Sequence, residues 1–111
     1  MSKEQTIHLT GRPAVRIQED DWPVIARAIW HDAETPALST DRAWVRVRRH
    51  VDGSTIVYGL RAEGSFEQKV GFLIDFEDAE LEDVTEAIQK TCSLVGIDPQ
   101  LVFDDMPPEP L

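Results

Sequence analysis

The sequence has little of what usually builds a catalytic or metal site. It contains a single cysteine, Cys92, which excludes an internal disulfide framework and a cysteine metal cage. The histidines, His8, His31 and His50, form no pair with one another or with an acid at a metal-binding or acid–base spacing. The glycines are spaced for turns and build no phosphate-binding loop. We therefore expect no metal, no cofactor and no enzymatic activity.

The chain also lacks long hydrophobic runs. No apolar stretch approaches the length that crosses a bilayer, and the first residues lead into no signal-peptide core. With 111 residues, 41% of them hydrophobic and 29% charged, the composition is that of an ordinary globular protein. We expect a single cytosolic α+β domain over residues 1–111, with flexible ends at 1–5 and 104–111.

Basic residues are scarce. The chain has 11 Lys and Arg against 21 Asp and Glu, a formal net charge of −10. Such a charge disfavours non-specific binding to nucleic acid or to anionic membranes. The distribution is uneven, because five arginines lie at positions 42–61, in or beside one predicted hairpin, while acids follow one another at the start of a predicted helix. This acidic patch comprises Glu77, Asp78, Glu80, Glu82, Asp83 and Glu86.

Residues 44–61 organise the rest of the chain. Two runs of β-branched and aromatic residues flank Asp52 and Gly53, which predicts a β-hairpin with a two-residue turn. That turn would place Val47 opposite Tyr58 and Val45 opposite Leu60. The face directed toward the core would then comprise Val45, Val47, Val51, Ile56, Tyr58 and Leu60. The other face would carry Trp44, Arg46, Arg48, His50, Thr55, Val57 and Arg61.

The remaining patterns predict the elements around this hairpin. Short strands at 6–10 and 14–17 are expected at a sheet edge, and apolar residues at helical spacing predict a helix over roughly 22 to 33. A third strand, 66–74, follows a three-residue loop. A helix from about 78 to 95 should end at Gly96, and Asp98 should cap a short helix over 100–103. The expected fold is a single antiparallel sheet in the order β-β-α-β-β-β-α, with a central three-stranded meander and two helices on one face.

The hairpin face opposite the core is the predicted contact surface. Apolar groups on adjacent strands would form a patch ringed by arginines there, and tryptophan and arginine are enriched where protein interfaces gain their energy. The candidate interface comprises Trp44, Arg46, Arg48, His50, Val57, Arg61 and Leu73. We expect a protein–protein interaction or regulatory module, most simply a homodimer. If the predicted helix with Trp22 and Trp30 covers this face instead, no partner is implied.

A nucleic-acid-directed role is the alternative. The arginines and Trp44 could bind a single strand by stacking and charge, although the net charge of −10 opposes it. The acidic patch could instead mimic nucleic acid and occupy a nucleic-acid-binding protein, which the arginines of the sheet oppose.

Overall fold

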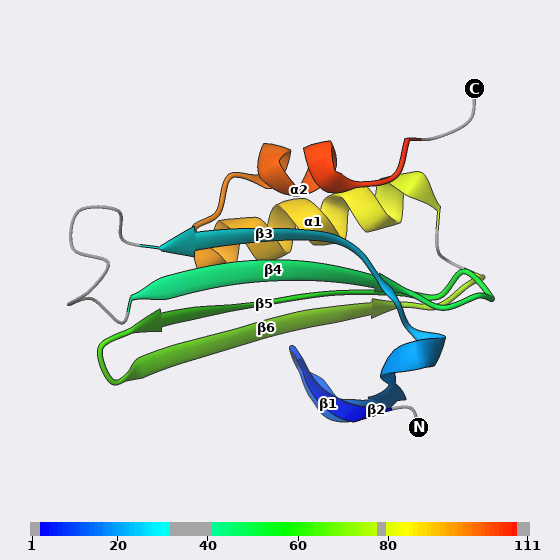
Figure 1. The fold of residues 1–111 in the computed structure, drawn as a ribbon, viewed down its shortest axis with the longest axis horizontal. Coiled ribbons are helices and arrows are strands. Elements are labelled where there is room, and N and C mark those ends of the chain that lie inside the picture. Colours follow the sequence, from blue (N-terminus) through cyan, green and yellow to red (C-terminus); the bar gives the residue numbers. More distant parts are fainter. Residues whose placement is uncertain (1–2, 32–40, 78–79, 109–111) are drawn as a thin grey trace.

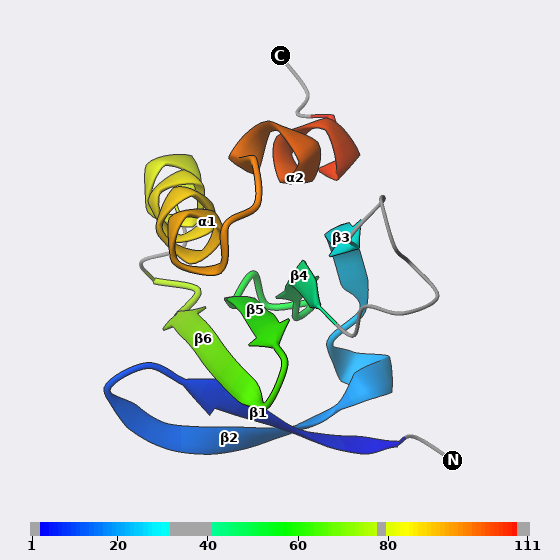
Figure 2. The ribbon, with the colours of Figure 1, turned by 90° about the vertical axis from the view of Figure 1, so that its left-hand side faces the viewer.

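Two helices, a four-stranded antiparallel sheet and a two-stranded hairpin form three layers in the computed structural model, which describes residues 3–31, 41–77 and 80–108. The helices cover one face of the four-stranded sheet and the hairpin crosses the other (Figures 1 and 2). The predicted α+β class and the packing of two helices on one face are confirmed. The elements are β1 (Glu4–Leu9), β2 (Arg12–Gln18), a 3₁₀ turn (Glu19–Asp21), β3 (Val24–His31), β4 (Arg42–Arg49), β5 (Thr55–Glu63), β6 (Phe66–Ile74), α1 (Leu81–Val95) and α2 (Pro99–Asp105).

The prediction of one sheet is wrong, because the two N-terminal strands pair only with each other. β1 and β2 form their own antiparallel sheet, and the other sheet has the order β3-β4-β5-β6. The layers meet at Gly71, whose amide donates to Thr10 Oγ1 and whose carbonyl accepts from the Thr10 amide. A Cβ at Gly71 would lie 2.1 Å from the His8 carbonyl oxygen, so glycine permits the hairpin to approach.

The prediction of a helix over roughly 22 to 33 is also wrong where the structure describes it; residues 32 and 33 lie outside the described part. This segment is β3, an edge strand paired with β4. Alternate residues of β3 point to opposite faces of the sheet. Ala26 and Ala28 are buried beneath the helices, while Ile29 lies on the other face and is 56% exposed. The acids Glu19, Asp20 and Asp21 form a short 3₁₀ turn, and the strand begins three residues after it, at Val24.

The β4–β5 hairpin exists, but its turn is one residue longer than predicted. His50 N–H donates to the Ser54 carbonyl at 2.8 Å, which leaves Val51, Asp52 and Gly53 as the loop. Gly53 alone adopts a left-handed φ of 99°, whereas the predicted turn also needs a positive φ at Asp52. The Ser54 amide donates to Asp52 Oδ1 and lowers the pKa of that carboxyl.

This extra loop residue reverses the faces of β5 relative to β4. Val47 pairs with Val57, not with Tyr58 as predicted, and Trp44 pairs with Leu60. Val57 therefore joins Val45 and Val47 on the helix side. The loop before β6 has two residues and not the predicted three, because Glu63 pairs with Phe66. Phe72 and Ile74 of β6 pack toward the helices.

Two hydrophobic cores result, one on each face of the four-stranded sheet. The core beneath the helices is formed by side chains of all four strands, α1 and α2, with Val45, Val57 and Ile88 among its most buried members. The core beneath the hairpin is smaller and centres on Ile7, Leu9, Ile17, Ile56 and Tyr58.

The two helices begin and end close to the predicted positions. α1 ends at Gly96, which adopts a φ of 77° and donates its N–H to the Cys92 carbonyl. The side chain of Asp98 accepts from the Gln100 amide and caps α2. Neither helix in the described part of the chain is long and apolar enough to cross a membrane.

Candidate functional site

The seven residues of the predicted interface do not share one surface. Val57 and Arg61 lie on the helix side, which corrects their predicted placement, because the longer turn reverses the faces of β5. Val57 is fully buried in the core. The Arg61 guanidinium donates from Nη1 to the Val95 carbonyl at 3.1 Å and pairs with Glu63. Arg61 therefore satisfies the C-terminal end of α1, where a cation is favourable.

Arg48 lies on the predicted face but is buried between the two sheets. Its Nε donates to Tyr58 Oη at 2.8 Å, Nη1 to the Trp22 carbonyl at 2.8 Å and Nη2 to Gln5 Oε1 at 2.9 Å. The guanidinium of Arg48, a residue of β4, thus forms hydrogen bonds with β5, with β1 and with the segment before β3. This geometry makes Arg48 a structural anchor of the N-terminal hairpin.

His50 and Leu73 also contact the N-terminal part of the chain. The imidazole of His50 packs against the Trp22 indole with ring centroids 5.0 Å apart. Leu73 packs against the hairpin core. Both side chains are half-buried and help to cover the sheet.

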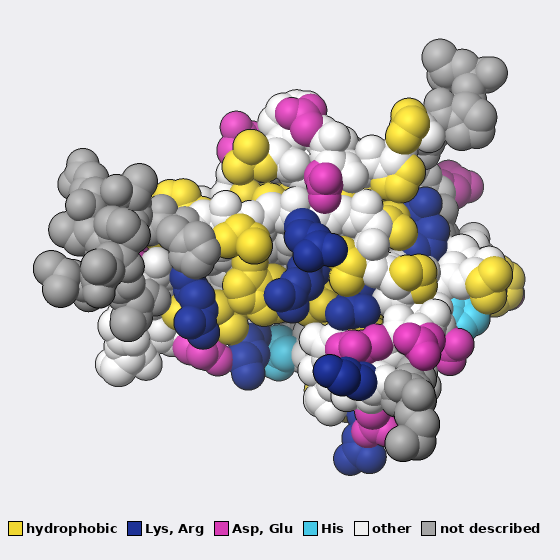
Figure 3. All heavy atoms as spheres, viewed as in Figure 1, with side chains coloured by type: hydrophobic (Ala, Val, Ile, Leu, Met, Phe, Trp, Pro, Cys, Tyr) yellow, Lys and Arg dark blue, Asp and Glu magenta, His cyan; other side chains and the backbone are white. Residues whose placement is uncertain are grey.

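The part of the face that remains open lies beside the hairpin, on β3 and β4. Trp44 is half-buried there, with Arg46 Cζ 4.3 Å from the centroid of its ring. Ile29 pairs with Trp44 across the two strands and is 56% exposed. We call these three residues the Trp44 strip. Figure 3 shows hydrophobic and basic side chains side by side along the β3 edge, between the helices and the hairpin.

Ile29 is the residue of the Trp44 strip that the sequence prediction missed. The helical assignment of residues 22–33 placed Ile29 on a buried stripe. No alternation marked this segment as a strand, because Ala28, Ile29 and Trp30 follow one another without a polar residue.

A groove of about 580 Å³ runs from Trp44 between β1 and the sheet. Its aromatic wall is formed by Trp44 and Tyr58, whose rings meet edge to face with centroids 5.4 Å apart. Residues of both sheets line it: Gln5, Thr6, Ile7, His8, Ala14, Trp44, Tyr58, Gly59, Leu60, Glu67, Lys69 and Val70. We call it the β1 groove. Its volume and its mixture of apolar and polar lining are typical of binding sites.

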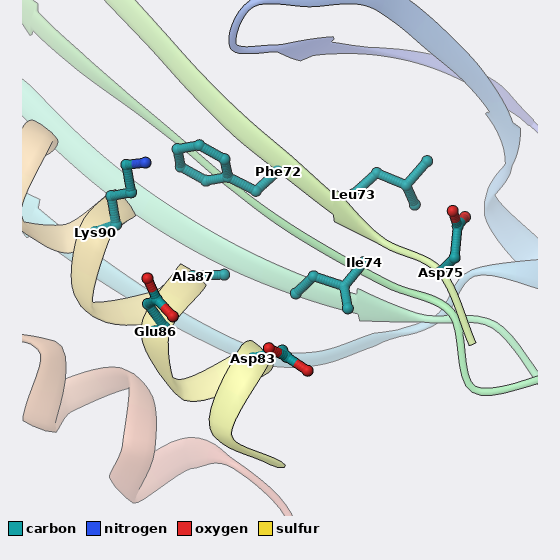
Figure 4. Close-up of a pocket in the computed structure, with 8 residues that line it drawn as sticks. All are labelled: Phe72, Leu73, Ile74, Asp75, Asp83, Glu86, Ala87 and Lys90. Carbon is teal, nitrogen blue, oxygen red and sulfur yellow. The ribbon is translucent and has the colours of Figure 1, made fainter. Parts of the chain in front are cut away.

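The acidic patch lies on the far side of the molecule. Glu77, Glu80, Glu82, Asp83 and Glu86 are exposed, and Asp78 lies outside the described residues. A second pocket of about 330 Å³ lies where α1 meets the end of β6 (Figure 4). Its floor is Phe72, Ile74 and Ala87, and Lys90 Nζ stands 5.1 Å from the Phe72 ring centroid. The cation of Lys90 thus already occupies the aromatic surface of this pocket.

No catalytic arrangement emerges among the described residues. They contain no group of three or more His, Cys, Asp or Glu that could hold a metal ion. Cys92 is fully buried in the helix-side core, and burial raises the pKa of its thiol to about 11, far from the range of a reactive thiolate. Comparison of the chain with protein-family models, curated proteins and solved structures finds no match.

Proposed function

We propose that this protein is a small interaction or regulatory module that self-associates through the Trp44 strip. The observation that carries the proposal is the exposure of Ile29 beside Trp44, at the place where the hairpin stops covering the sheet. Single exposed apolar residues are common on protein surfaces. A β-branched residue, an indole and a stacked guanidinium on neighbouring strands together have the composition of an interface centre.

A second copy of the chain is the simplest partner for the Trp44 strip. A two-fold arrangement would allow the apolar members of the Trp44 strip to pack against their own copies. The open face also carries Arg27, Arg42, Arg46 and Lys69, while the acidic patch lies on the helix side. These cations would lie at the rim of the contact, where water and salt screen their mutual repulsion.

Light scattering over a concentration series tests the proposal. We expect the mass to rise from 12.5 kDa toward twice that value, and Ile29→Lys to keep it at the monomer value. Ile29 is more than half exposed, so this substitution leaves the fold intact. Leu94→Lys is the matched control, because Leu94 is also an exposed apolar residue, 42% exposed, but lies on α1. A wild-type protein that stays monomeric, or an Ile29→Lys protein that dimerises as before, would overturn the proposal.

Single-stranded nucleic acid is the competing ligand for the same face. Base stacking requires an open aromatic surface, but Arg46 covers one side of Trp44 and Tyr58 meets it edge-on. The net charge adds long-range repulsion. Binding to a labelled oligonucleotide that weakens steeply with salt and disappears in Arg46→Glu would favour this ligand over a second copy.

A further inference from the structure

The outer edge of β3 presents unpaired main-chain groups. β3 ends the order β3-β4-β5-β6, and no strand lies beyond it in the part of the chain that the structure describes (Figure 2). The Arg27 amide donates to Asp105 Oδ2 of α2 and so points away from β4. Main-chain groups of alternate residues point to the same side of a strand, so the amides and carbonyls of Ile29 and His31 also point outward. Such an edge is a template for a further strand.

The opposite edge of the sheet, β6, is protected by its own chain. The amide and the carbonyl of Gly71 point outward and are both bound by Thr10 of the hairpin. Closer to the start of β6, the residues in step with Gly71 are Glu67 and Lys69, which are charged. Charged side chains at a sheet edge discourage pairing with another chain.

The first half of β3 is protected as well, but its second half is not. The register against β4 shifts between Val24 and Ala26, and Asp105 occupies the Arg27 amide. Bulges and carboxylates of this kind keep an edge from pairing. The stretch over residues 28–31 contains no acid, lysine, arginine or proline. This half is therefore the part of the β3 edge that can accept a strand.

The exposed apolar side chains of β3 require a partner at the edge. Ile29 and Trp30 are neighbours in the chain and lie on opposite faces of the sheet, with 56% and 42% of each exposed. Trp30 shares the helix side with Ala28, near the exposed Leu101 of α2. A partner that packs on one face would cover only one of the two side chains. A strand that lies along the edge contacts both.

A second copy of β3 is complementary to this edge. In an antiparallel pair about a two-fold axis at Trp30, Ile29 and His31 of the second copy exchange both of their main-chain hydrogen bonds. The two Trp30 residues then lie in the non-hydrogen-bonded position, with Cα atoms about 4.5 Å apart, where aromatic pairs stabilise a sheet. Because Asp105 already binds the Arg27 amide, this register is favoured over those that would pair Arg27.

The charges at the edge are compatible with this arrangement. Arg27 lies on the strand, and Asp104 and Asp105 lie beside it on α2. An edge that carries both signs meets a copy of itself without the repulsion that a surface of one sign would cause.

We infer that two copies of this chain pair through residues 28–31 of β3, antiparallel about Trp30, so that their four-stranded sheets form one continuous sheet. This inference rests on the proposed self-association and identifies the contact that produces it. Ile29 contributes to the contact on the hairpin side, Trp30 contributes on the helix side, and main-chain hydrogen bonds join the two strands.

Single cysteine substitutions test the register, because Cys92 is fully buried and does not compete. In Trp30→Cys the two thiols meet across the axis, so we expect oxidised glutathione to produce a covalent dimer on a non-reducing gel. In Ile29→Cys the two positions lie diagonally about 7 to 8 Å apart, too far for a disulfide, and covalent dimer should be at least about fivefold less. Leu94→Cys is the control for random collision, because Leu94 has the same 42% exposure as Trp30 but lies on α1.

Hydrogen exchange on the wild type tests the same contact without a substitution. The amides of Ile29 and His31 should exchange at least about tenfold more slowly in a dimeric sample than in a dilute, monomeric one. The Arg27 amide is the internal control, because Asp105 binds it in both states and its rate should not change.

These measurements separate the inference from the proposed function. If the wild type dimerises while the amides of Ile29 and His31 exchange as in the monomer, the inference is overturned and the proposed function stands. The same conclusion follows if Ile29→Cys forms more covalent dimer than Trp30→Cys. If light scattering finds the wild type monomeric at every concentration, the proposed function fails, and the pairing of β3 fails with it.

Discussion

The two faces of the four-stranded sheet are covered by different physical means. On the helix side, α1 and α2 exclude water over most of the sheet, and the buried core there is almost entirely aliphatic. On the other side, a two-stranded hairpin covers only part of the sheet and is tied down by hydrogen bonds centred on Arg48. The helix side is held together by the hydrophobic effect, because its stabilisation is roughly proportional to the apolar area that the helices bury. The second depends on a few directional contacts and leaves an apolar strip open.

This difference explains where binding surface is found. On the helix side, Lys90 overhangs the pocket of about 330 Å³ at the end of β6, and a pocket of about 310 Å³ lies where α2 meets β3. A hairpin that crosses the sheet at one end leaves a groove along its side, which becomes the β1 groove. The β1 groove is larger than either of these helix-side pockets, and it lies on the less completely covered face.

Truncation of one aliphatic side chain in each core should give the largest effects. We expect Ile88→Ala on the helix side to lower the free energy of unfolding by about 4 kcal/mol, and Ile7→Ala in the hairpin core by about 2 to 3 kcal/mol. Both side chains are fully buried, but the hairpin layer can relax around a cavity more easily. Urea unfolding measures both values. Equal losses would show that the hairpin is as rigidly packed as the helices.

Loss of the Arg48 guanidinium should release the hairpin without unfolding the sheet. Arg48→Ala leaves the acceptors on Tyr58, Trp22 and Gln5 without their donor and costs about 2 to 3 kcal/mol. Amide hydrogen exchange should accelerate in β1 and β2 while β4 and β5 stay protected. Arg48→Lys is the control, because an ammonium cannot serve three acceptors in this fork geometry and should also loosen the hairpin. Uniform acceleration over both sheets would contradict the view that the hairpin is held locally.

Removal of a buried hydroxyl should strengthen the helix-side core. Thr91 is fully buried, and its Oγ1 has no hydrogen-bond partner among the described residues. Thr91→Val removes this polar atom at nearly constant volume and should raise the free energy of unfolding by about 1 kcal/mol. Thermal unfolding measures the shift, with Thr85→Val on the same helix as the control, since Thr85 is only half-buried. A destabilised Thr91→Val protein would show that the hydroxyl is hydrogen-bonded in solution.

The sequence alone was sufficient for the parts of the fold that local signals determine. The β4–β5 hairpin, the strand β6, the end of α1 at Gly96 and the cap of α2 at Asp98 all follow from turn and capping residues. The interface prediction was only partly useful, because a single additional loop residue moved Val57 and Arg61 to the other face. Alternation determines which residues share a face within one strand. Only the length of the turn determines which face of the next strand lies on the same side of the sheet.

The segment at β3 required information that no local pattern contains. Its apolar residues fit helical spacing as well as an edge strand that uses both faces. The strand wins because Ala26 and Ala28 are small enough to lie beneath α2, and because the Arg27 amide donates to Asp105 Oδ2 at 2.8 Å. Both reasons depend on a helix 78 residues away in the sequence. Tertiary packing overrides the helical propensity of alanine here.

The thiol of Cys92 should not change the pH dependence of the free energy of unfolding near neutral pH, but it should change it at high pH. Burial raises the pKa of its thiol from 9.0 to about 11, so the folded state disfavours the thiolate. Stability from this group is complete below the unfolded pKa and is lost as pH rises from 9.0 to about 11, since the unfolded chain releases the proton first. The free energy of unfolding should therefore fall more steeply with pH in the wild type than in Cys92→Ala over that range. Near pH 7 the two slopes should coincide, because both states then hold the proton. Identical slopes at high pH would place Cys92 in contact with water, against its burial beneath the helices.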